Sequence, residues 1–243
     1  FDVDKVTGPI SSPTASKNLR ELFGIESAPE ARGHVIVIDV LRAFTTAAFA
    51  FSKGAGQIFL VSKPEEAFAL KQKNPEFVLV GENGGIKIEG FDFGNSPHEM
   101  SKQDFTGKSL VLRSSSGTQG VVFSKNATKI YLGSLVVAEA TVQALALANE
   151  ISILAMGAPN GPDGDEDIAC SNYMKSLFEE APIDHDIITG RVDYSAAGKQ
   201  ADNPECFWFS PQDLSCATQI NKFRFSMPVY KENGYLIARK QES

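Results

Sequence analysis

Five carboxylates follow apolar runs of this chain or lie in the loops between them. Asp39 and Glu82 each end a run that is otherwise apolar, Asp92 lies in a glycine-rich loop, and Glu166 and Asp167 follow a third run. Hard cations such as Mg²⁺ bind oxygen ligands, usually one or two carboxylates together with water and substrate oxygens. These acids are therefore more than enough for one magnesium site.

Each of these acids also has a simpler interpretation. A carboxylate at the position of Asp39 can pair with Arg42 or cap the helix that follows it. Acids in a first helical turn, as expected for Asp165, Glu166 and Asp167, are favoured by the helix dipole alone. The acids by themselves leave metal binding and helix capping as open alternatives.

A run of hydroxyl and glycine residues follows another apolar segment. Residues 114–120 read Ser-Ser-Ser-Gly-Thr-Gln-Gly and lie between an expected strand and an expected helix. Free backbone N–H groups, hydroxyls and the helix dipole together suit phosphate or sulfonate oxygens, whereas the alternative is a small-residue turn that caps a helix. Arg42 and Arg113 lie near these segments, and arginine can hold a phosphate with two hydrogen bonds. For Arg113 a plain surface charge is the alternative.

The overall composition narrows the class of ligand. The chain has 243 residues, a net charge of −7 and no basic cluster, so nucleic-acid binding is not expected. No apolar run is as long as a membrane span, so no membrane partner is expected. Cys170, Cys206 and Cys216 lack the spacing of a disulfide framework or a zinc site, which indicates the reducing cytoplasm. A small anionic, phosphorylated substrate is the partner that fits.

Apolar runs rich in β-branched residues alternate with stretches of helical composition. Strands are expected at 34–40, 57–61, 77–80, 108–112, 129–132 and 151–156, and helices at 41–52, 64–73, 136–150 and 165–180. This alternation predicts crossover connections and a mostly parallel sheet. In such sheets ligands bind outside the carboxyl ends of the strands, which is where the acids, glycines and serines stand.

The predicted fold class is α/β, with a mostly parallel or mixed central sheet and helices on both faces. Glu232-Asn233-Gly234 between two apolar stretches predicts a C-terminal hairpin, because Asn-Gly supplies the positive backbone angles of a tight turn. Residues 1–30 are expected to form an irregular or helical lead-in, and 184–243 to be less regular. We expect one unit over 1–243, and two closely packed lobes of about 1–135 and 136–243 are the alternative.

Taken together and in this order, these strand ends resemble the 2-phosphosulfolactate phosphatase family. The matching segments are 37–46, 81–82, 90–97, 116–118 and 166–167. The segment Gly-Phe-Asp-Phe-Gly-Asn-Ser-Pro at 90–97 is the most specific of them. The resemblance extends from about Gly33 to about Pro228 and so covers most of the chain.

The resemblance implies a Mg²⁺-dependent hydrolase that cleaves the phosphate monoester of a small hydroxy acid, 2-phosphosulfolactate or a related compound. The residues it implies as catalytic are Asp39, Glu82 and Asp92. Those it implies for substrate binding are Arg42, Asn95, Ser96, Ser116, Gly117 and Thr118. The Mg²⁺ ligands it implies are Asp39, Glu166 and Asp167.

The sequence departs from the family pattern at several positions. Asn83 stands where the family usually has arginine, and this loss of a cation is expected to weaken binding of a sulfonated dianion. Met156 replaces a frequent cysteine, which excludes a cysteine nucleophile there. A non-catalytic anion-binding protein with the same fold is therefore an alternative, and a metal-dependent lyase or isomerase is a weaker one. The substrate, the mode of attack and the oligomeric state, homo-oligomers included, stay open.

Overall fold

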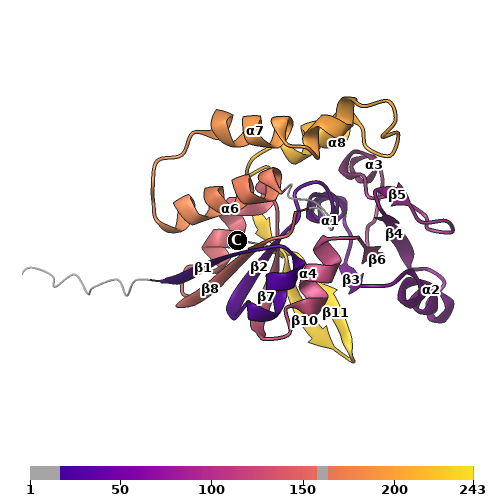
Figure 1. Ribbon diagram of the computed structural model, residues 1–243. Helices are drawn as coiled ribbons and strands as arrows, with labels where there is room; N and C mark the ends of the chain where they lie inside the picture. The colour runs from indigo at the N-terminus through magenta and orange to yellow at the C-terminus, as the bar shows by residue number, and fades with distance from the viewer. Residues whose placement is uncertain (1–16, 158–163, 243) are drawn as a thin grey trace, which may run out of the picture.

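A mixed sheet of ten strands organises the residues that this computed structural model describes, 17–157 and 164–242 (Figure 1). In spatial order the strands are β1 (Asn18–Phe23), β8 (Glu150–Ala155), β2 (Gly33–Ile38), β7 (Ala127–Gly133), β10 (Pro228–Glu232), β11 (Tyr235–Ala238), β3 (Gln57–Val61), β6 (Ser109–Arg113), β4 (Val78–Asn83) and β5 (Ile86–Lys87). A separate small sheet pairs β9 (Phe225–Ser226) with β12 (Gln241–Glu242).

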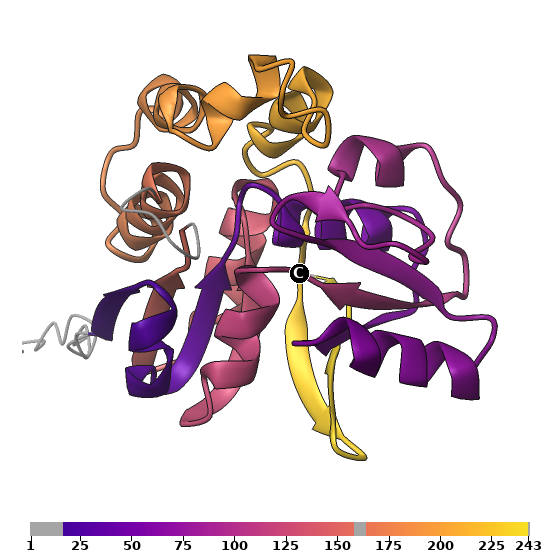
Figure 2. The same cartoon turned by 45° about the vertical axis from the view of Figure 1, so that its right-hand side comes forward.

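The large sheet consists of two parallel blocks joined by the C-terminal hairpin. Strands β1, β8, β2 and β7 run parallel to one another, and so do β3, β6 and β4. The hairpin β10–β11 pairs antiparallel with β7 on one side and with β3 on the other. Figure 2 shows this hairpin, in yellow, between the two blocks. Three successive antiparallel pairings make β3 run opposite to β7. The predicted mixed sheet and C-terminal hairpin are confirmed.

Alternate residues of β2 enter two different hydrophobic cores. Val35 and Val37 belong to one cluster of buried residues, and Ile36 and Ile38 belong to another. Successive side chains of a strand point to opposite faces, so both faces of the sheet are covered here. This arrangement explains why the segment is apolar throughout instead of alternating with polar residues.

Helices pack on the sheet and continue into a layer above it. The α-helices are α1 (Ala43–Ser52), α2 (Pro64–Lys73), α3 (Pro97–Ser101), α4 (Gly117–Phe123), α5 (Ala138–Ala144), α6 (Asp165–Phe178), α7 (His185–Tyr194) and α8 (Pro211–Ala217). Short 3-10 turns form η1 (Ile25–Glu30), η2 (Leu135–Val137) and η3 (Gly198–Asp202). α6 contacts β1, β2 and β8, α7 contacts α6, and α8 contacts α3. α7 and α8 lie above the sheet in Figure 1.

Three segments differ from the sequence prediction. β1 lies in the expected irregular or helical lead-in, whose residues 1–16 are outside the described part. The helix expected over 136–150 ends at Ala144, because the chain must turn before Glu150, where β8 begins to pair with β1. The tail expected to be less regular contains α7 and α8. The division into two lobes stays a prediction.

Within residues 17–157 and 164–242, none of the helices combines the length and the apolar composition that crossing a bilayer requires.

Candidate functional site

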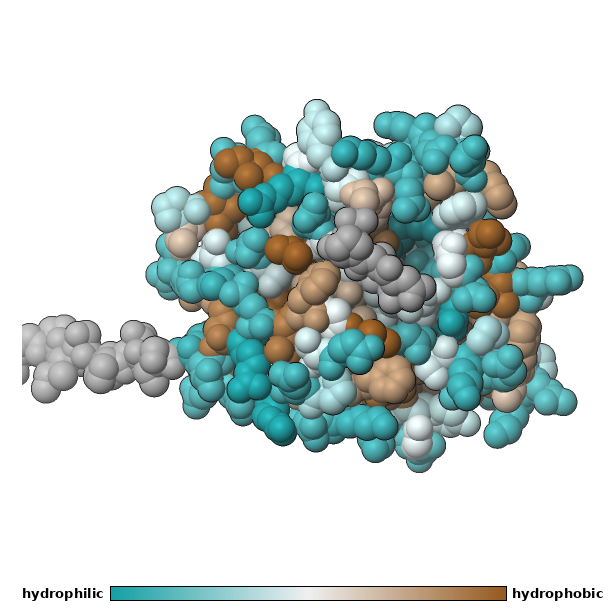
Figure 3. Space-filling view, viewed as in Figure 1, coloured by the Kyte–Doolittle hydropathy of each residue, from teal (hydrophilic) through white to brown (hydrophobic). Residues whose placement is uncertain are grey.

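A cleft of about 240 Å³ lies where strand ends of both blocks meet. Its lining includes residues that follow or end four strands, β2, β4, β6 and β8: Asp39, Glu82, Ser115, Ser116 and Gly157. Glu166 and Asp167 reach it from the first turn of α6. The structure thus brings together the strand ends that the sequence singled out, although the blocks run in opposite directions. On the face seen in Figure 3, hydrophilic residues predominate and apolar ones stand in small groups.

Asp39 connects the end of β2 with two other elements. Its Oδ1 accepts the N–H of Ala43, the first residue of α1, at 2.9 Å. Its Oδ2 accepts the N–H of Gly117 at 2.8 Å, and the residue is only 5% exposed. Asp39 therefore holds the start of a helix and lines the cleft at once, so the helix-capping and site interpretations both apply.

The two acids at the start of α6 are held differently. Asp167 accepts the N–H of Val40 at 2.7 Å and that of Gly157 at 2.8 Å, which ties α6 to the ends of β2 and β8. Glu166 is also buried, yet its Oε2 has no hydrogen-bond partner among residues 17–157 and 164–242. A buried carboxylate oxygen without a donor is costly unless a ligand or an ion satisfies it. Glu166 is thus the acid that presents a free buried oxygen to the cleft.

Glu82 organises the two loops on the other side of the cleft. Its Oε2 accepts the N–H of Gly85 at 2.6 Å and the hydroxyl of Ser115 at 3.0 Å. Its Oε1 accepts the N–H of Ser115 at 2.5 Å. One carboxylate therefore fixes the loop after β4 against the loop after β6, and it remains part of the cleft wall.

The buried acids of the cleft raise one another's pKa. Burial raises the pKa of Asp39 to about 6, and the negative charge of Glu82 adds to the rise. Burial likewise raises the pKa of Glu166 to about 7, with contributions from Asp39 and Asp165. The pKa of Asp167 lies well above its ordinary value because of burial and of the charges of Glu166 and Asp39. Groups that titrate near neutral pH suit proton transfer, and a nearby cation would relieve their repulsion.

Arg42 and Asn95 supply the polar groups that an anion would contact. Arg42 is the only basic residue among those that line the cleft in the described part of the chain. Burial lowers the pKa of its guanidinium. Asn95 is 5% exposed, its side-chain N–H groups can donate to an anion, and its Oδ1 has no hydrogen-bond partner within the described part of the chain. Both residues therefore lie where the sequence analysis placed them, at the site.

Of the three residues predicted at the serine loop, one lines the cleft. Ser116 does so, with its hydroxyl donating to the carbonyl of Gly157 at 2.6 Å. Gly117 holds Asp39 through its N–H and is buried. Thr118 is buried, and its hydroxyl accepts the N–H of Ser114 at 2.9 Å. The small-residue turn is thus the better description of Thr118, which braces the loop.

Asp92 and Ser96 are not among the cleft residues, and we no longer assign them catalytic or substrate contacts. The carboxylate of Asp92 lies 2.6 Å from Lys71 Nζ and accepts the N–H of Leu79 at 2.8 Å. Ser96 caps α3 by accepting the N–H of Glu99, and its hydroxyl donates to Asp213. The specific segment at 90–97 therefore contributes mainly structure, with Asn95 as its cleft residue.

Sequence reasoning missed one wall of the cleft. Trp208, Phe209, Gln200 and Ala197 line it, and all lie in the tail that was expected to be less regular. Gly85 allows this packing, because a Cβ there would lie 2.3 Å from Trp208 Nε1. The available signal was the spacing Ser210-Pro-Gln-Asp213, a serine with an acid three residues later, which forms a capping box at α8.

The donor set fits a hard cation only in part. No group of three His, Cys, Asp or Glu side chains within residues 17–157 and 164–242 is arranged to hold a metal ion. The predicted trio Asp39, Glu166 and Asp167 is therefore not a preformed cage. Mg²⁺ usually keeps several waters and takes one or two carboxylates plus substrate oxygens, and the free Glu166 Oε2 meets that requirement. The residues present fit a cation completed by water and substrate.

Comparisons with known proteins identify the family of this chain. The family model described as 2-phosphosulpholactate phosphatase matches residues 24–206. A "Probable 2-phosphosulfolactate phosphatase" of Bacillus subtilis (strain 168) is 42% identical over 148 residues, 59% of this chain and 63% of that protein. Proteins of the same name from Carboxydothermus hydrogenoformans and Caldicellulosiruptor saccharolyticus are 42% and 37% identical over 60% of this chain, and the match covers 60% and 63% of their lengths. The match thus spans less than two thirds of each of these relatives. Because the family model covers most of the chain, this protein belongs to the 2-phosphosulfolactate phosphatase family.

Proposed function

We propose that this protein is a Mg²⁺-dependent phosphatase that hydrolyses the phosphate monoester of a small hydroxy acid. The family membership supports the reaction class, and the names of the curated relatives agree with it. The observation that carries the proposal is the cluster of buried acids beside Arg42, Asp39, Glu166 and Asp167, whose pKa values are raised by burial and further by neighbouring carboxylate charges. Such a cleft is suited to a cation and an anionic ester bound together.

The carboxylates divide into two roles. Glu166, with its free Oε2, and Asp39 or Asp167 would hold Mg²⁺, which when bound neutralises phosphate charge and lowers the pKa of its water. Where Asp167 and not Asp39 binds the metal, Asp39, with a pKa of about 6, can accept a proton from an attacking water at neutral pH. Its two backbone hydrogen bonds keep its carboxylate in one orientation during that transfer.

Arg42 and Asn95 hold the phosphate in this proposal. A guanidinium binds phosphate oxygens with two parallel hydrogen bonds, and a buried amide donates one more. Arg42, the basic residue of the cleft, can neutralise one anionic group of the substrate in addition to the oxygens that the metal would bind. Asn83, where the family has arginine, is exposed, and its Oδ1 accepts from Arg113. A phosphorylated hydroxy acid with fewer charges than 2-phosphosulfolactate is therefore as good a candidate as that compound.

A phosphate-release screen tests the proposal. Small phosphorylated hydroxy acids, 2-phosphosulfolactate included, are incubated with the protein in Mg²⁺ and in EDTA. We expect release with Mg²⁺ that EDTA and Asp39→Asn abolish, while the exposed Asp186→Asn keeps it. Thermal stabilisation by these compounds without turnover would favour the non-catalytic anion-binding alternative. A product other than phosphate would favour a lyase or an isomerase.

A further inference from the structure

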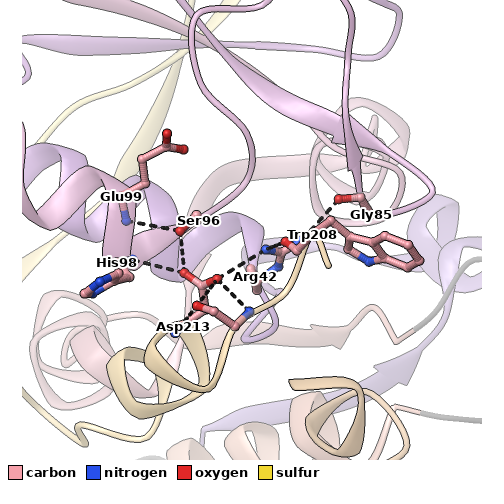
Figure 4. A network of polar contacts seen from close by, with 8 residues as sticks. Arg42, Gly85, Ser96, His98, Glu99, Trp208 and Asp213 are labelled. Atoms are coloured by element: carbon pink, nitrogen blue, oxygen red, sulfur yellow. Dashed lines mark hydrogen bonds and ion pairs between the residues drawn. The ribbon is translucent and has the colours of Figure 1, made fainter. Parts of the chain in front are cut away.

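We infer that Asp213, which lies outside the range matched by the family model, is the positioning residue that orients Arg42 toward the phosphate. The inference rests on the proposed function, because it concerns the residue that binds the anion. Asp213 Oδ2 lies 3.6 Å from Arg42 NH1, and both side chains are almost completely buried, at 3% and 6% exposure. Figure 4 shows the two side chains facing each other within one polar network.

The guanidinium of Arg42 is held on several sides by the chain itself. NH1 donates to the carbonyl of Trp208 at 2.6 Å, and NH2 donates to that of Gly85 at 3.3 Å. The group also lies over the ring of Phe209, with 4.9 Å from its central carbon to the ring centroid. A guanidinium has five N–H groups; the two carbonyls use two of them and a third faces Asp213, which leaves two. The remaining donors are available to a ligand in the cleft.

The carboxylate of Asp213 is fixed from directions other than that of Arg42. Its Oδ1 accepts the hydroxyl of Ser96 and the N–H of His98 at 3.1 Å. Its Oδ2 accepts the hydroxyl of Ser210 at 2.9 Å. The N–H of Ser210 also donates to Oδ2, at 3.2 Å, so four donors from the start of α3 and the cap of α8 fix the position of this negative charge. A charge fixed in this way can in turn define the position of the guanidinium.

The network also explains two residues that the cleft itself does not. Ser96 belongs to the most specific segment of the sequence, yet it contacts Asp213 and not the cleft. Asp213 lies in the first turn of α8, and the family model ends at residue 206, before this helix begins. The C-terminal helix thus contributes to anion binding indirectly, by placing one buried charge beside the arginine.

A double-mutant cycle tests the inference. Asp213→Asn, Arg42→Lys and the double variant are compared with wild type for KM and kcat of phosphate release, and for the Kd of inorganic phosphate in Mg²⁺ by calorimetry. A misplaced binding group costs up to about 100-fold, so we expect Asp213→Asn to raise KM and Kd about tenfold with kcat little changed. In the Arg42→Lys background the same change should have an effect of less than about twofold.

Two further variants separate positioning from general stability. Asp184→Asn makes the same chemical change at the exposed cap of α7 and should leave KM and Kd unchanged. Ser96→Ala removes a donor to Asp213 without touching its charge and should raise both constants in the same direction by less. Where Asp213→Asn does not fold, the cycle is run with Ser96→Ala instead.

The two constants keep this inference distinct from the proposed function. Suppose that wild type releases phosphate, but Asp213→Asn has no effect on KM and Kd, or has the same effect in wild type and in Arg42→Lys. That result overturns the inference and leaves the phosphatase proposal intact. Suppose instead that wild type releases no phosphate, but the Kd of inorganic phosphate depends on Asp213 only when Arg42 is present. That result overturns the phosphatase proposal and supports the inference.

Discussion

The backbone N–H of Gly117 donates to Oδ2 of Asp39 at 2.8 Å, although 78 residues separate them in the chain. The bond joins the loop after β6 to the end of β2, and therefore joins the two parallel blocks at the cleft. A Cβ at position 117 would lie 2.6 Å from that oxygen and 3.0 Å from the ring of Phe44. Close approach, and not a special backbone angle, is what requires glycine here.

Gly117→Ala is expected to displace Asp39 and to lower both stability and activity. Overpacking of this kind typically lowers the free energy of unfolding by about 1–3 kcal/mol. Urea unfolding and the phosphate-release assay measure the two effects. Gly190→Ala in α7 is the matched control, because no atom lies within 4 Å of the added Cβ. That variant should be neutral or slightly more stable, and equal losses in both variants would contradict the account.

Thr118 braces the serine loop, so its hydroxyl is expected to matter for stability and not for substrate affinity. The hydroxyl accepts the N–H of Ser114 at 2.9 Å and donates to the carbonyl of the same residue at 2.9 Å. Thr118→Val keeps the shape and removes these bonds, which should lower the free energy of unfolding by about 1–3 kcal/mol. Thr118→Ser keeps the hydroxyl and should lose less. A large rise in KM for folded Thr118→Val, without a loss of stability, would return this residue to the substrate-binding set.

Asp92 is expected to be dispensable for the reaction. Its exposed carboxylate is paired with Lys71, and such exposed ion pairs stabilise a protein by about 0–1 kcal/mol. Asp92→Asn should therefore change stability by no more than about that amount and leave phosphate release near the wild-type rate. The pKa of Asp92 is lowered by its hydrogen bonds to Lys71 and Leu79, against the opposing effect of burial, so any stability it contributes is lost at acid pH. A rate that collapses in Asp92→Asn while folding is intact would restore its predicted catalytic role.

The strand ends were predictable because their residues conflict with their surroundings. Asp39 stands in an apolar run, and a buried carboxylate needs a specific partner, so its importance is visible from the sequence. Asn95 and Glu166 were singled out by their segments instead, and each has a buried oxygen without a hydrogen-bond partner in the part of the chain that the structure describes.

The remaining parts of the site depend on tertiary geometry that local patterns do not encode. Asp92 lies in a glycine-rich loop, as a site residue would. Its carboxylate, however, turns to Lys71, which is 21 residues away in the chain, and no local pattern predicts that pairing. The aromatic wall at Trp208 and Phe209 lies in a stretch with no periodic pattern, and it reaches the cleft only because α8 packs on α3. The two sheet blocks run in opposite directions because the hairpin pairs antiparallel with both of them, and the sequence of a single strand does not predict such pairings.

Glu166 is expected to reduce the stability of the protein in the absence of a cation. Its pKa in the folded protein is about 7, above its ordinary value of 4.5, so the folded state binds the proton more tightly than the unfolded state. The free energy of unfolding should therefore fall as pH rises from about 4 to about 7 and stay low above that range, by on the order of 2–3 kcal/mol. Glu166→Gln should remove this part of the pH dependence and abolish phosphate release.

Thermal unfolding at pH 5 and pH 8, with and without Mg²⁺, measures how much stability the charged Glu166 costs and how much of it a cation restores. At pH 8 Mg²⁺ is expected to raise the Tm of wild type, because a cation offsets the buried negative charge, and to raise that of Glu166→Gln much less. Glu179→Gln, an exposed change at the other end of the same helix, should behave as wild type. If wild type and Glu166→Gln lose stability equally between the two pH values, Glu166 is not the strained acid of this cleft. If Mg²⁺ stabilises both equally, its binding site does not include that carboxylate.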